Sequence, residues 1–458
     1  MRSVAWSIVD KLIDCVSCGS FPYRHTAAEI DRTAHEIRET AAVNPRNCEA
    51  RRISAIRGVK VRYTFGRTVH HRGKKPVDQS NQVALGETLL DYVERGATAT
   101  CESIYRQTVA EYTCANQAAA EEQAFFRRRM LCIGLSARLP EPGTFLTDEL
   151  SGVPVLMTRD AEGNVHAFLN VCRHRGSSVA QSCGKAKAFT CPYHAWTYNL
   201  NGELVARPEE ASFAGADRGT HGLTKLNAAE HNGMLWVCPT PGLAIDLEEQ
   251  LAGLSPELAA YKLDTFHHFD SCIIQRRMNW KLVVDTFLES YHFCVLHKDT
   301  ICSIFYDNLT AFDNWGSNFR IVSARRSIDA LKQQPHSQWN IMPHIVGIYV
   351  LFPNTVLVWQ LDHIELWHIY PYGDDPDESI LRLDLYTPEP AINEKARQYW
   401  QKNLDLVVKV VQEEDFPVGE TIQHGFHSGA QDHIIFGTNE PALSFFHRAI
   451  TESVREMR

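Results

Sequence analysis

Residues Val171–Tyr198, VCRHRGSSVAQSCGKAKAFTCPYHAWTY, decide how the rest of the chain is interpreted. The stretch holds a Cys-x-His pair, Cys172 and His174, and a Cys-x-x-His pair, Cys191 and His194. Four such ligands can bind a tetrahedral zinc ion, or a [2Fe–2S] cluster in which two histidines replace two cysteines on one iron. The tight Cys-x-His spacing favours the cluster, because it places neighbouring ligands on different irons more easily than on one zinc ion.

The two motifs CRHRG and CPYHAWTY resemble the cluster motif of the Rieske non-haem iron oxygenases, in the terminal oxygenase (α) subunits of multicomponent systems. Respiratory-chain Rieske proteins carry an extra cysteine in each loop, joined as a disulfide, whereas this chain has Ser177 and Tyr193 at those positions. The resemblance covers about residues 105–458. It implies an α+β fold, with a small all-β Rieske domain and a helix-grip catalytic domain built on a twisted antiparallel sheet and long helices.

Composition indicates an ordinary globular protein of two or three domains, with 458 residues, 44% hydrophobic content and 22% charged content. A net charge of −9 gives no reason to expect nucleic acid or an acidic membrane as a partner. No apolar run is long enough to predict a transmembrane helix, and Asp10 and Asp14 interrupt the first apolar stretch, which a secretory signal would avoid. Thirteen irregularly spaced cysteines do not predict a disulfide framework, so we expect a cytoplasmic protein.

Changes of pattern along the chain divide it into four parts. Alternating apolar residues between glycine and proline turns predict short strands, and recurrences at three and four positions predict helices. The expected parts are an N-terminal extension of unclear structure (1–105), an N-terminal helix of the catalytic part (106–135), the Rieske domain (136–242) and the catalytic mononuclear iron domain (243–458).

The extension contains a basic run, Arg51–Lys75, and a Cys15-x-x-Cys18 pair. The basic run is interpreted as a solvated segment, and the pair as ordinary cysteines, because no second metal-binding pair follows. We expect weak burial of the whole extension, and no role for it in the chemistry.

A second metal site is needed, because a Rieske cluster transfers single electrons and has no open coordination position. Two histidines and one carboxylate on one face of an iron ion leave positions for dioxygen and substrate. Glu289 and His292 are three positions apart and would share one face of a helix. His297 can rejoin that face only if the helix loosens after Cys294.

The segment NWKLVVDTFLESYHFCVLH resembles the iron-site helix of the family. The resemblance implies that His292 and His297 are iron ligands. It also implies that Glu289 connects to a cluster histidine of a neighbouring subunit, and that Asp285 is a supporting acid one turn earlier. Thr286 stands where many members have asparagine, which leaves its role open.

The third iron ligand is expected from EEDFPVGETIQHG, where Asp415 precedes Gln423 by eight positions, as in the acid-then-glutamine pattern of the family. Glu414 is the competing carboxylate, and a solvated acidic helix face is the alternative interpretation.

The resemblance implies a terminal oxygenase that uses O₂, a [2Fe–2S] cluster and mononuclear Fe(II) to monohydroxylate, dihydroxylate or oxidatively demethylate a small organic molecule. No dinucleotide-binding GxGxxG motif follows a strand, so NAD(P)H would act through a separate reductase, with or without a ferredoxin. The family pattern implies a homotrimer (α3), with α3β3 as the alternative, because cluster and iron within one chain are too far apart. The rival interpretation is a Rieske electron-transfer protein with an inactive C-terminal domain.

The substrate is predicted to be aromatic, or another flat organic molecule, because the candidate pocket residues are mostly apolar. These are Phe293, Phe305, Tyr349, Phe352, Val358, Trp359 and Trp367.

Overall fold

The computed structural model describes residues 79–457, and its residues 131–237 contain eleven short strands. The Cys15-x-x-Cys18 pair and the Arg51–Lys75 run lie outside the described residues. The strands form three sheets, with the orders β10-β5-β4-β3-β6, β11-β12-β2 and β7-β8-β9. They are β2 (Leu131–Leu135), β3 (Thr144–Asp148), β4 (Val155–Arg159), β5 (Val165–Leu169), β6 (Cys183–Lys185), β7 (Ala188–Thr190), β8 (Thr197–Asn199), β9 (Leu204–Ala206), β10 (Lys225–Leu226), β11 (Ala228–His231) and β12 (Met234–Val237).

The turn between β8 and β9 contains the Asn201-Gly202 pair. Gly202 has φ +79°, and a Cβ at this position would lie 2.3 Å from the ring of Phe168. Only glycine fits both the left-handed backbone and this close approach, which explains why the cluster-bearing hairpin turns here. Short 3₁₀ segments complete this part of the chain: η2 (Ser136–Arg138), η3 (Glu210–Phe213) and η4 (Arg218–Thr220).

A seven-stranded antiparallel sheet dominates the second half of the chain, as the alternating pattern predicts. Its order is β13-β19-β18-β17-β16-β15-β14. The strands are β13 (His267–Arg276), β14 (Phe305–Trp315), β15 (Asn318–Arg325), β16 (Ile345–Leu351), β17 (Thr355–Gln360), β18 (His363–Pro371) and β19 (Ser379–Thr387). Together with the small β sheets, it confirms the predicted α+β class.

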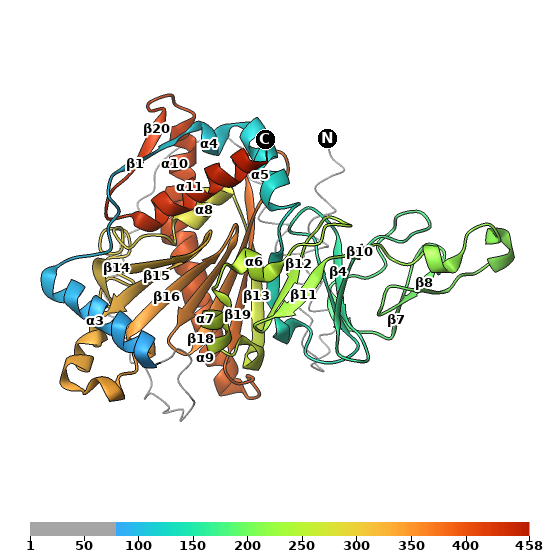
Figure 1. Ribbon diagram of the computed structural model, residues 1–458, viewed down its shortest axis with the longest axis horizontal. Coiled ribbons are helices and arrows are strands. Elements are labelled where there is room, and N and C mark those ends of the chain that lie inside the picture. Colours follow the sequence, from blue (N-terminus) through green and yellow to red (C-terminus); the bar gives the residue numbers. More distant parts are fainter. Residues whose placement is uncertain (1–78, 458) are drawn as a thin grey trace, which may run out of the picture. The chain divides into compact units, whose positions relative to one another are not determined.

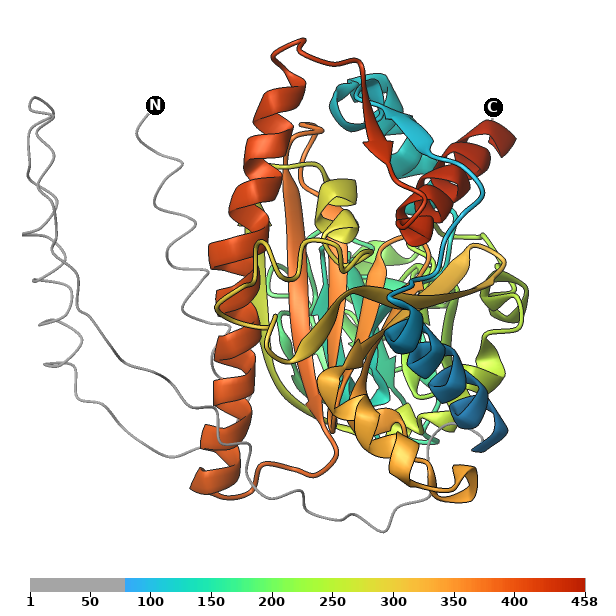
Figure 2. The same ribbon diagram turned by 90° about the vertical axis from the view of Figure 1, so that its left-hand side faces the viewer.

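Helices cover one face of this sheet (Figure 1), where α11 lies against β15 and α8 against β18. Figure 2 shows the helical segment Glu394–Phe426 running along the sheet. The helices on this side are α5 (Ala115–Phe125), α8 (Trp280–Asp285), α9 (Glu394–Val410), α10 (Phe416–Phe426) and α11 (Pro441–Glu456), with the short α4 (Ala110–Thr113) and the two-stranded pair β1 (Tyr105–Thr108) and β20 (His433–Phe436) beside them. Residues Val411–Asp415, between α9 and α10, are π-helical. Pro417 cannot donate a backbone hydrogen bond to the preceding turn, which favours this local widening.

Successive residues of a strand point to opposite faces, so the sheet separates two apolar cores. Phe293, Phe305, Phe352, Val358 and Trp367 belong to the core under the long helices. Tyr349 and Trp359, which the sequence analysis placed in the same pocket, belong to the other core. The prediction was wrong for these two residues because a shift of one position along a strand reverses the face.

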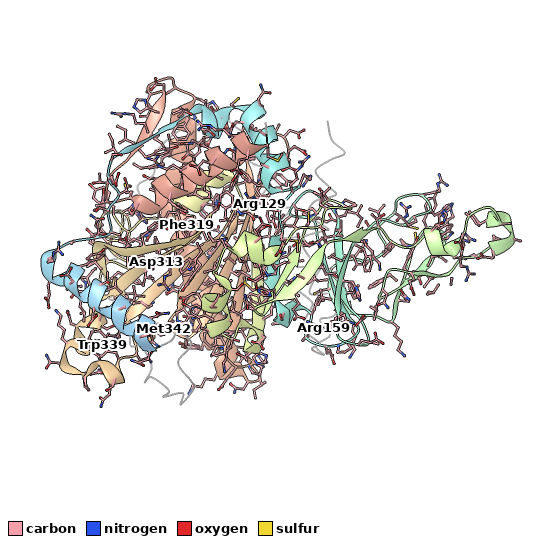
Figure 3. All side chains as sticks on the ribbon, viewed as in Figure 1. Arg129, Arg159, Asp313, Phe319, Trp339 and Met342 are labelled. Atoms are coloured by element: carbon pink, nitrogen blue, oxygen red, sulfur yellow. A yellow bond between two sulfur atoms is a disulfide. The ribbon has the colours of Figure 1, made fainter. Side chains whose placement is uncertain are left out.

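The other core is closed by short helices and by a helix of the N-terminal part. Here α6 (Leu247–Leu251), α7 (Ser255–Ala260), η5 (Leu263–Thr265), η6 (Arg326–Gln333), η7 (His336–Gln338) and η8 (Met342–His344) join α3 (Gln79–Arg95). Leu89 and Leu90 of α3 are buried in this core, beside Trp339 and Met342 (Figure 3). Weak burial was therefore the wrong expectation for residues 79–95. A Cβ on Gly86 would lie 2.8 Å from the Trp339 ring, so the helix and the indole approach as closely as a glycine allows.

A buried charge cluster joins the large sheet to the Rieske part. Arg382 of β19 donates to Asp148 of β3 at 2.5 Å, to the carbonyl of Ile133 at 2.8 Å and to Asp384 at 3.1 Å. Burial opposes ionisation of Asp384, but Arg382 and Arg138 hold its pKa well below the ordinary value. Each buried charge has partners of opposite charge, and these partners offset the free-energy cost of removing the charge from water.

Candidate functional site

The four predicted cluster residues lie on two loops beside short strands. Cys172 and His174 follow β5, while Cys191 and His194 lie between β7 and β8. In both loops the amide four positions after the cysteine donates to that cysteine's carbonyl, which forms a tight turn. The two turns present their side chains to one another.

Ring contacts hold the two loops together. The imidazoles of His174 and His194 lie 4.6 Å apart between centroids. Trp196 stacks on His174 at 5.0 Å with an interplanar angle of 8°. The guanidinium of Arg175 lies 5.1 Å from the ring centroid of Tyr193 on the other loop.

Both thiols and one phenol occupy the buried end of this site. Cys172 is 2% exposed and Cys191 is 3% exposed. The hydroxyl of Tyr198 lies 3.3 Å from Sγ of Cys172, where it can donate to a sulfur ligand. Burial first, and then the Cys172 sulfur, raise the pKa of Tyr198, so this hydroxyl keeps its proton.

His174 fits a metal ligand. Its Nδ1 is buried and has no hydrogen-bond partner among residues 79–457. Burial lowers the pKa of His174, and the nearby His194 and Arg175 lower it further. The imidazole is therefore neutral, as metal binding requires. Two buried thiols and two adjacent imidazoles, one with an orphaned nitrogen, fit a Rieske [2Fe–2S] cluster.

The NWK segment anchors the start of the second site. Asn279 accepts the amide of Lys281 and caps α8. Nζ of Lys281 lies 2.8 Å and 2.7 Å from the two carboxylate oxygens of Glu121 in α5, which also accepts from the Trp280 indole at 3.0 Å. This ion pair is fully buried and fixes the position of α8 against α5.

The helix predicted to carry the iron ligands ends earlier than expected, since α8 stops at Asp285. Beyond it, Glu289 accepts the backbone amides of Tyr291 and His292 through Oε2. A side-chain carboxylate that satisfies these amides competes with the helical hydrogen bonds. Glu289 and His292 therefore meet through this turn, rather than on a shared helix face.

Two imidazoles and one carboxylate converge as the sequence predicted. The Nε2 atoms of His297 and His292 lie 3.0 Å and 3.6 Å from Oδ1 of Asp415. The potential ligand atoms of these three residues all lie within 4.8 Å of one another. Two histidines and one carboxylate fit mononuclear Fe(II) with open coordination positions.

A second carboxylate supports each imidazole from behind. Nδ1 of His292 contacts Oε1 of Glu289, and Nδ1 of His297 contacts Oε2 of Glu414. Both Nε2 atoms are thereby directed to the common centre, as is usual for metal-bound histidines. From the sequence, Glu414 is expected only as a competing ligand. Its supporting position follows from the π-helical turn, which brings Glu414 and its neighbour Asp415 to the same histidine.

The pKa of His297 reflects the two carboxylates beside it. Burial disfavours its charged form, but Asp415 and Glu414 together raise the pKa of His297 above its ordinary value. The same two carboxylates would compensate the charge of a bound cation.

Two other predicted positions lie apart from this set. Asp285 accepts from Tyr112 at 2.9 Å and lies 2.9 Å from Nε2 of His447, so its contacts are with α4 and α11. Thr286 donates to the carbonyl of Val283 at 2.8 Å, within its own turn.

A disulfide that the sequence analysis did not predict closes the loop around His297. Cys294 and Cys302 are bonded, eight positions apart. The loop that this disulfide closes carries one candidate ligand, His297. The chain enters β14 shortly after the loop, at Phe305.

The fold and the two sites define an iron protein with two kinds of centre, one suited to single-electron transfer and one open to dioxygen. Residues 129–240 match the family described as Rieske [2Fe-2S] domain, and residues 263–456 match the catalytic domain of the ring hydroxylating alpha subunit. The chain belongs to the Rieske non-haem iron oxygenases, as an oxygenase-component α subunit, and it is an oxidoreductase that uses a Rieske cluster and a mononuclear iron.

Curated relatives are oxygenase subunits that are named for quaternary ammonium compounds. A carnitine monooxygenase oxygenase subunit of Acinetobacter baumannii is 26% identical over 322 residues, 69% of this chain and 84% of the relative. A glycine betaine monooxygenase oxygenase subunit of Chromohalobacter salexigens is 35% identical over 228 residues, 49% of each chain. The chloroplastic choline monooxygenase of Spinacia oleracea is 27% identical over 316 residues, 68% of this chain and 69% of the relative.

Solved structures share the fold. A quaternary ammonium Rieske monooxygenase with L-carnitine has a TM-score of 0.66 at 19% identity, covering 77% of this chain and 96% of the other. A naphthalene 1,2-dioxygenase variant with phenanthrene has a TM-score of 0.61 at 17% identity, covering 78% and 93%. Among the described residues, no helix is long and apolar enough to cross a membrane.

Proposed function

We propose that this oxygenase inserts one oxygen atom into a C–H bond beside the nitrogen of a small quaternary ammonium compound, with electrons from a separate reductase. The observation that carries the proposal is the group of relatives named for carnitine, glycine betaine and choline, all of them monooxygenases. The aromatic substrate expected from the sequence has weaker support, because the naphthalene dioxygenases are similar in fold alone.

In this proposal, Cys172, His174, Cys191 and His194 hold the cluster, and His292, His297 and Asp415 hold the iron. The iron supplies the coordination and redox chemistry that activates dioxygen. The protein fixes the geometry, since Glu289 and Glu414 accept from Nδ1 of the two imidazoles and direct Nε2 inward. An intact set of this kind also disfavours a protein restricted to electron transfer.

Aromatic side chains beside the imidazoles suit an ammonium group. The ring of Phe293 lies 5.2 Å from that of His292 and 5.7 Å from that of Phe305. Phe287 lies 5.3 Å from Trp367 on the same face of the sheet. Aromatic faces attract cations, and quaternary ammonium groups are recognised in this way.

A homotrimer would bring the cluster of one subunit to the iron of the next, through Glu289. Exposed apolar side chains support this assembly: Tyr193 at the cluster loop is 58% exposed, and Tyr291 and Val295 at the iron loop are 60% and 79% exposed. Large apolar groups on a surface commonly mark an interface. The related carnitine-oxidising structure has been described in terms of inter-subunit electron transfer.

The test is reconstitution with a surrogate reductase under ¹⁸O₂, with L-carnitine, glycine betaine, choline, naphthalene and indole as substrates. The proposal predicts one labelled oxygen in a product of an ammonium compound, and oxygen uptake that matches product. Labelled diols from the arenes, with no product from the ammonium compounds, would contradict it.

A further inference from the structure

A carboxylate is buried in the sheet face that lies under the long helices. Glu365 of β18 is 4% exposed. Its cross-strand partners are Val358 and Leu385, both buried and apolar. Placing a carboxylate in such surroundings is costly unless strong partners compensate its charge.

The partners of Glu365 within the protein are weak. The indole Nε1 of Trp367 lies 3.4 Å from Oε2, and Nε2 of His363 lies 3.7 Å from Oε1. Charge-assisted hydrogen bonds are typically about 2.7–2.9 Å long. His363 is closer to Asp362, at 3.1 Å, so its charge is shared with a second acid. Across residues 79–457, Oε1 of Glu365 thus has no donor within 3.5 Å.

A buried cation with a free donor group lies on the same face. Arg325 of β15 is 8% exposed. Its Nε donates to the carbonyl of Ile345 at 3.2 Å, and its Nη2 donates to Gln360 at 2.8 Å. Nη1 has no acceptor in the described part of the chain. Burial lowers the pKa of Arg325 to about 10, and the negative charge of Glu365 opposes this shift.

Both groups are connected to the iron site by aromatic rings. The guanidinium of Arg325 lies 4.7 Å from the Phe305 ring centroid, and Phe305 contacts Phe293, which contacts both ligand imidazoles. Trp367, which lies beside Glu365, contacts Phe287, and Phe287 shortly precedes the segment with His292 and His297. The two charges therefore border the aromatic surroundings of the iron.

We infer that Glu365 and Arg325 are the two poles of the substrate site, and that the substrate is a zwitterion whose ammonium group faces Glu365 and whose carboxylate faces Arg325. This inference rests on the proposed function and narrows its substrate class. A cation without a carboxylate leaves Nη1 of Arg325 without an acceptor, and a neutral arene leaves Nη1 of Arg325 and Oε1 of Glu365 both without a partner. A betaine-type molecule satisfies both poles, and its net charge of zero matches the opposite signs of the pair.

The experiment compares Arg325→Gln and Glu365→Gln with two matched controls. Arg326→Gln changes the adjacent, exposed arginine, and Glu413→Gln changes an exposed acid near the iron helix. Dissociation constants for glycine betaine, L-carnitine and choline are measured by titration calorimetry on the iron-loaded protein, and kcat and KM are measured with a reductase. Iron content and thermal unfolding verify that each variant is folded.

Wild type is expected to bind a zwitterion at least about tenfold more tightly than choline. Arg325→Gln should lose this preference by weakening zwitterion binding alone, Glu365→Gln should weaken all three ligands, and the controls should match wild type. Arg325→Lys should restore part of the preference, because it keeps the charge but not the planar donor pair.

Equal affinity of wild type for choline and the zwitterions would overturn the inference without any variant, and so would an unchanged preference in folded Arg325→Gln. If ammonium compounds are oxidised in either case, the proposed function stands and only the two-pole site fails. If wild type oxidises arenes and no ammonium compound, the proposed function itself fails.

Discussion

Glu414 and Asp415 are adjacent in sequence and contact opposite nitrogens of His297, Nδ1 and Nε2 respectively. In a regular helix, neighbouring side chains diverge by about 100°. The π-helical turn at Val411–Asp415 accommodates both carboxylates at one imidazole. Glu414 can then orient His297 through Nδ1, while Asp415 would bind the same metal ion as Nε2 of His297.

Glu414→Gln should therefore weaken iron binding without removing the site. The amide keeps the shape but offers one acceptor oxygen instead of two, and loss of such outer partners typically costs about 10–100-fold in metal affinity. Iron affinity is measured by competition with a chelator. Glu413→Gln, in which the changed side chain is 66% exposed, is the control and should leave affinity unchanged. Equal affinities for both variants and wild type would remove Glu414 from the site.

Glu289→Gln should keep both metal sites, with the iron held more weakly as in Glu414→Gln, and should nearly abolish coupled turnover. Both carboxylate oxygens are engaged, Oε1 with His292 and Oε2 with the amides of Tyr291 and His292. Substitution leaves too few acceptors for these groups and for the proposed contact with a histidine of a neighbouring subunit. The measurement is single turnover of the chemically reduced variant, with iron quantified in the same sample. Near-normal product per reduced site at full iron loading would exclude Glu289 from the electron path.

Asp384→Asn should destabilise the protein by about 3–5 kcal/mol, because it removes the carboxylate that Arg382 and Arg138 share in the buried charge cluster. The folded-state pKa of Asp384 is depressed. Its contribution is therefore fully present above the unfolded-state pKa, about 3.9, and is lost as pH falls toward the lower folded-state pKa. Urea unfolding between pH 7 and 3 should show less acid sensitivity in the variant. Asp91→Asn, at an exposed pair, is the control with an expected loss of at most about 1 kcal/mol.

Removal of α3 should destabilise the catalytic part, although the sequence predicts no role in the chemistry for residues 1–105. Leu89 and Leu90 are 0% and 7% exposed, and full burial of one such side chain is worth about 1.5–3 kcal/mol. Chains that begin at residue 79 and at residue 106 differ by this helix and the segment that follows it. Equal unfolding free energies for the two chains would show that α3 contributes nothing.

The sequence was most informative where partners are close along the chain. Each Cys/His pair lies in a single turn: Cys172 with His174, and Cys191 with His194. The spacing of each pair in the sequence is therefore enough to predict that its side chains lie close together. The alternating strands of the large sheet were equally legible. The segment after Asp285 was predicted as helix because its apolar spacing is helical, but the Glu289 carboxylate binds the amides that a helix would need.

Other features depend on distant contacts that no local pattern contains. Tyr349 and Trp359 were assigned to the wrong face of the sheet, because a difference of one position along a strand decides which face a side chain takes. The burial of α3 depends on Trp339, more than 240 positions later. The support of His297 by Glu414 depends on a helix defect over five residues, Val411–Asp415.

Iron and acid-labile sulfide per chain, measured together in wild type, His174→Ala and Asp415→Ala, test most directly that the chain carries two separate iron centres. Wild type should contain about three irons and two sulfides, from one [2Fe–2S] cluster and one mononuclear iron. His174→Ala should retain about one iron and lose the sulfide, and Asp415→Ala should retain about two irons with both sulfides. Folded Asp415→Ala with all three irons, or folded His174→Ala with none, would contradict the account.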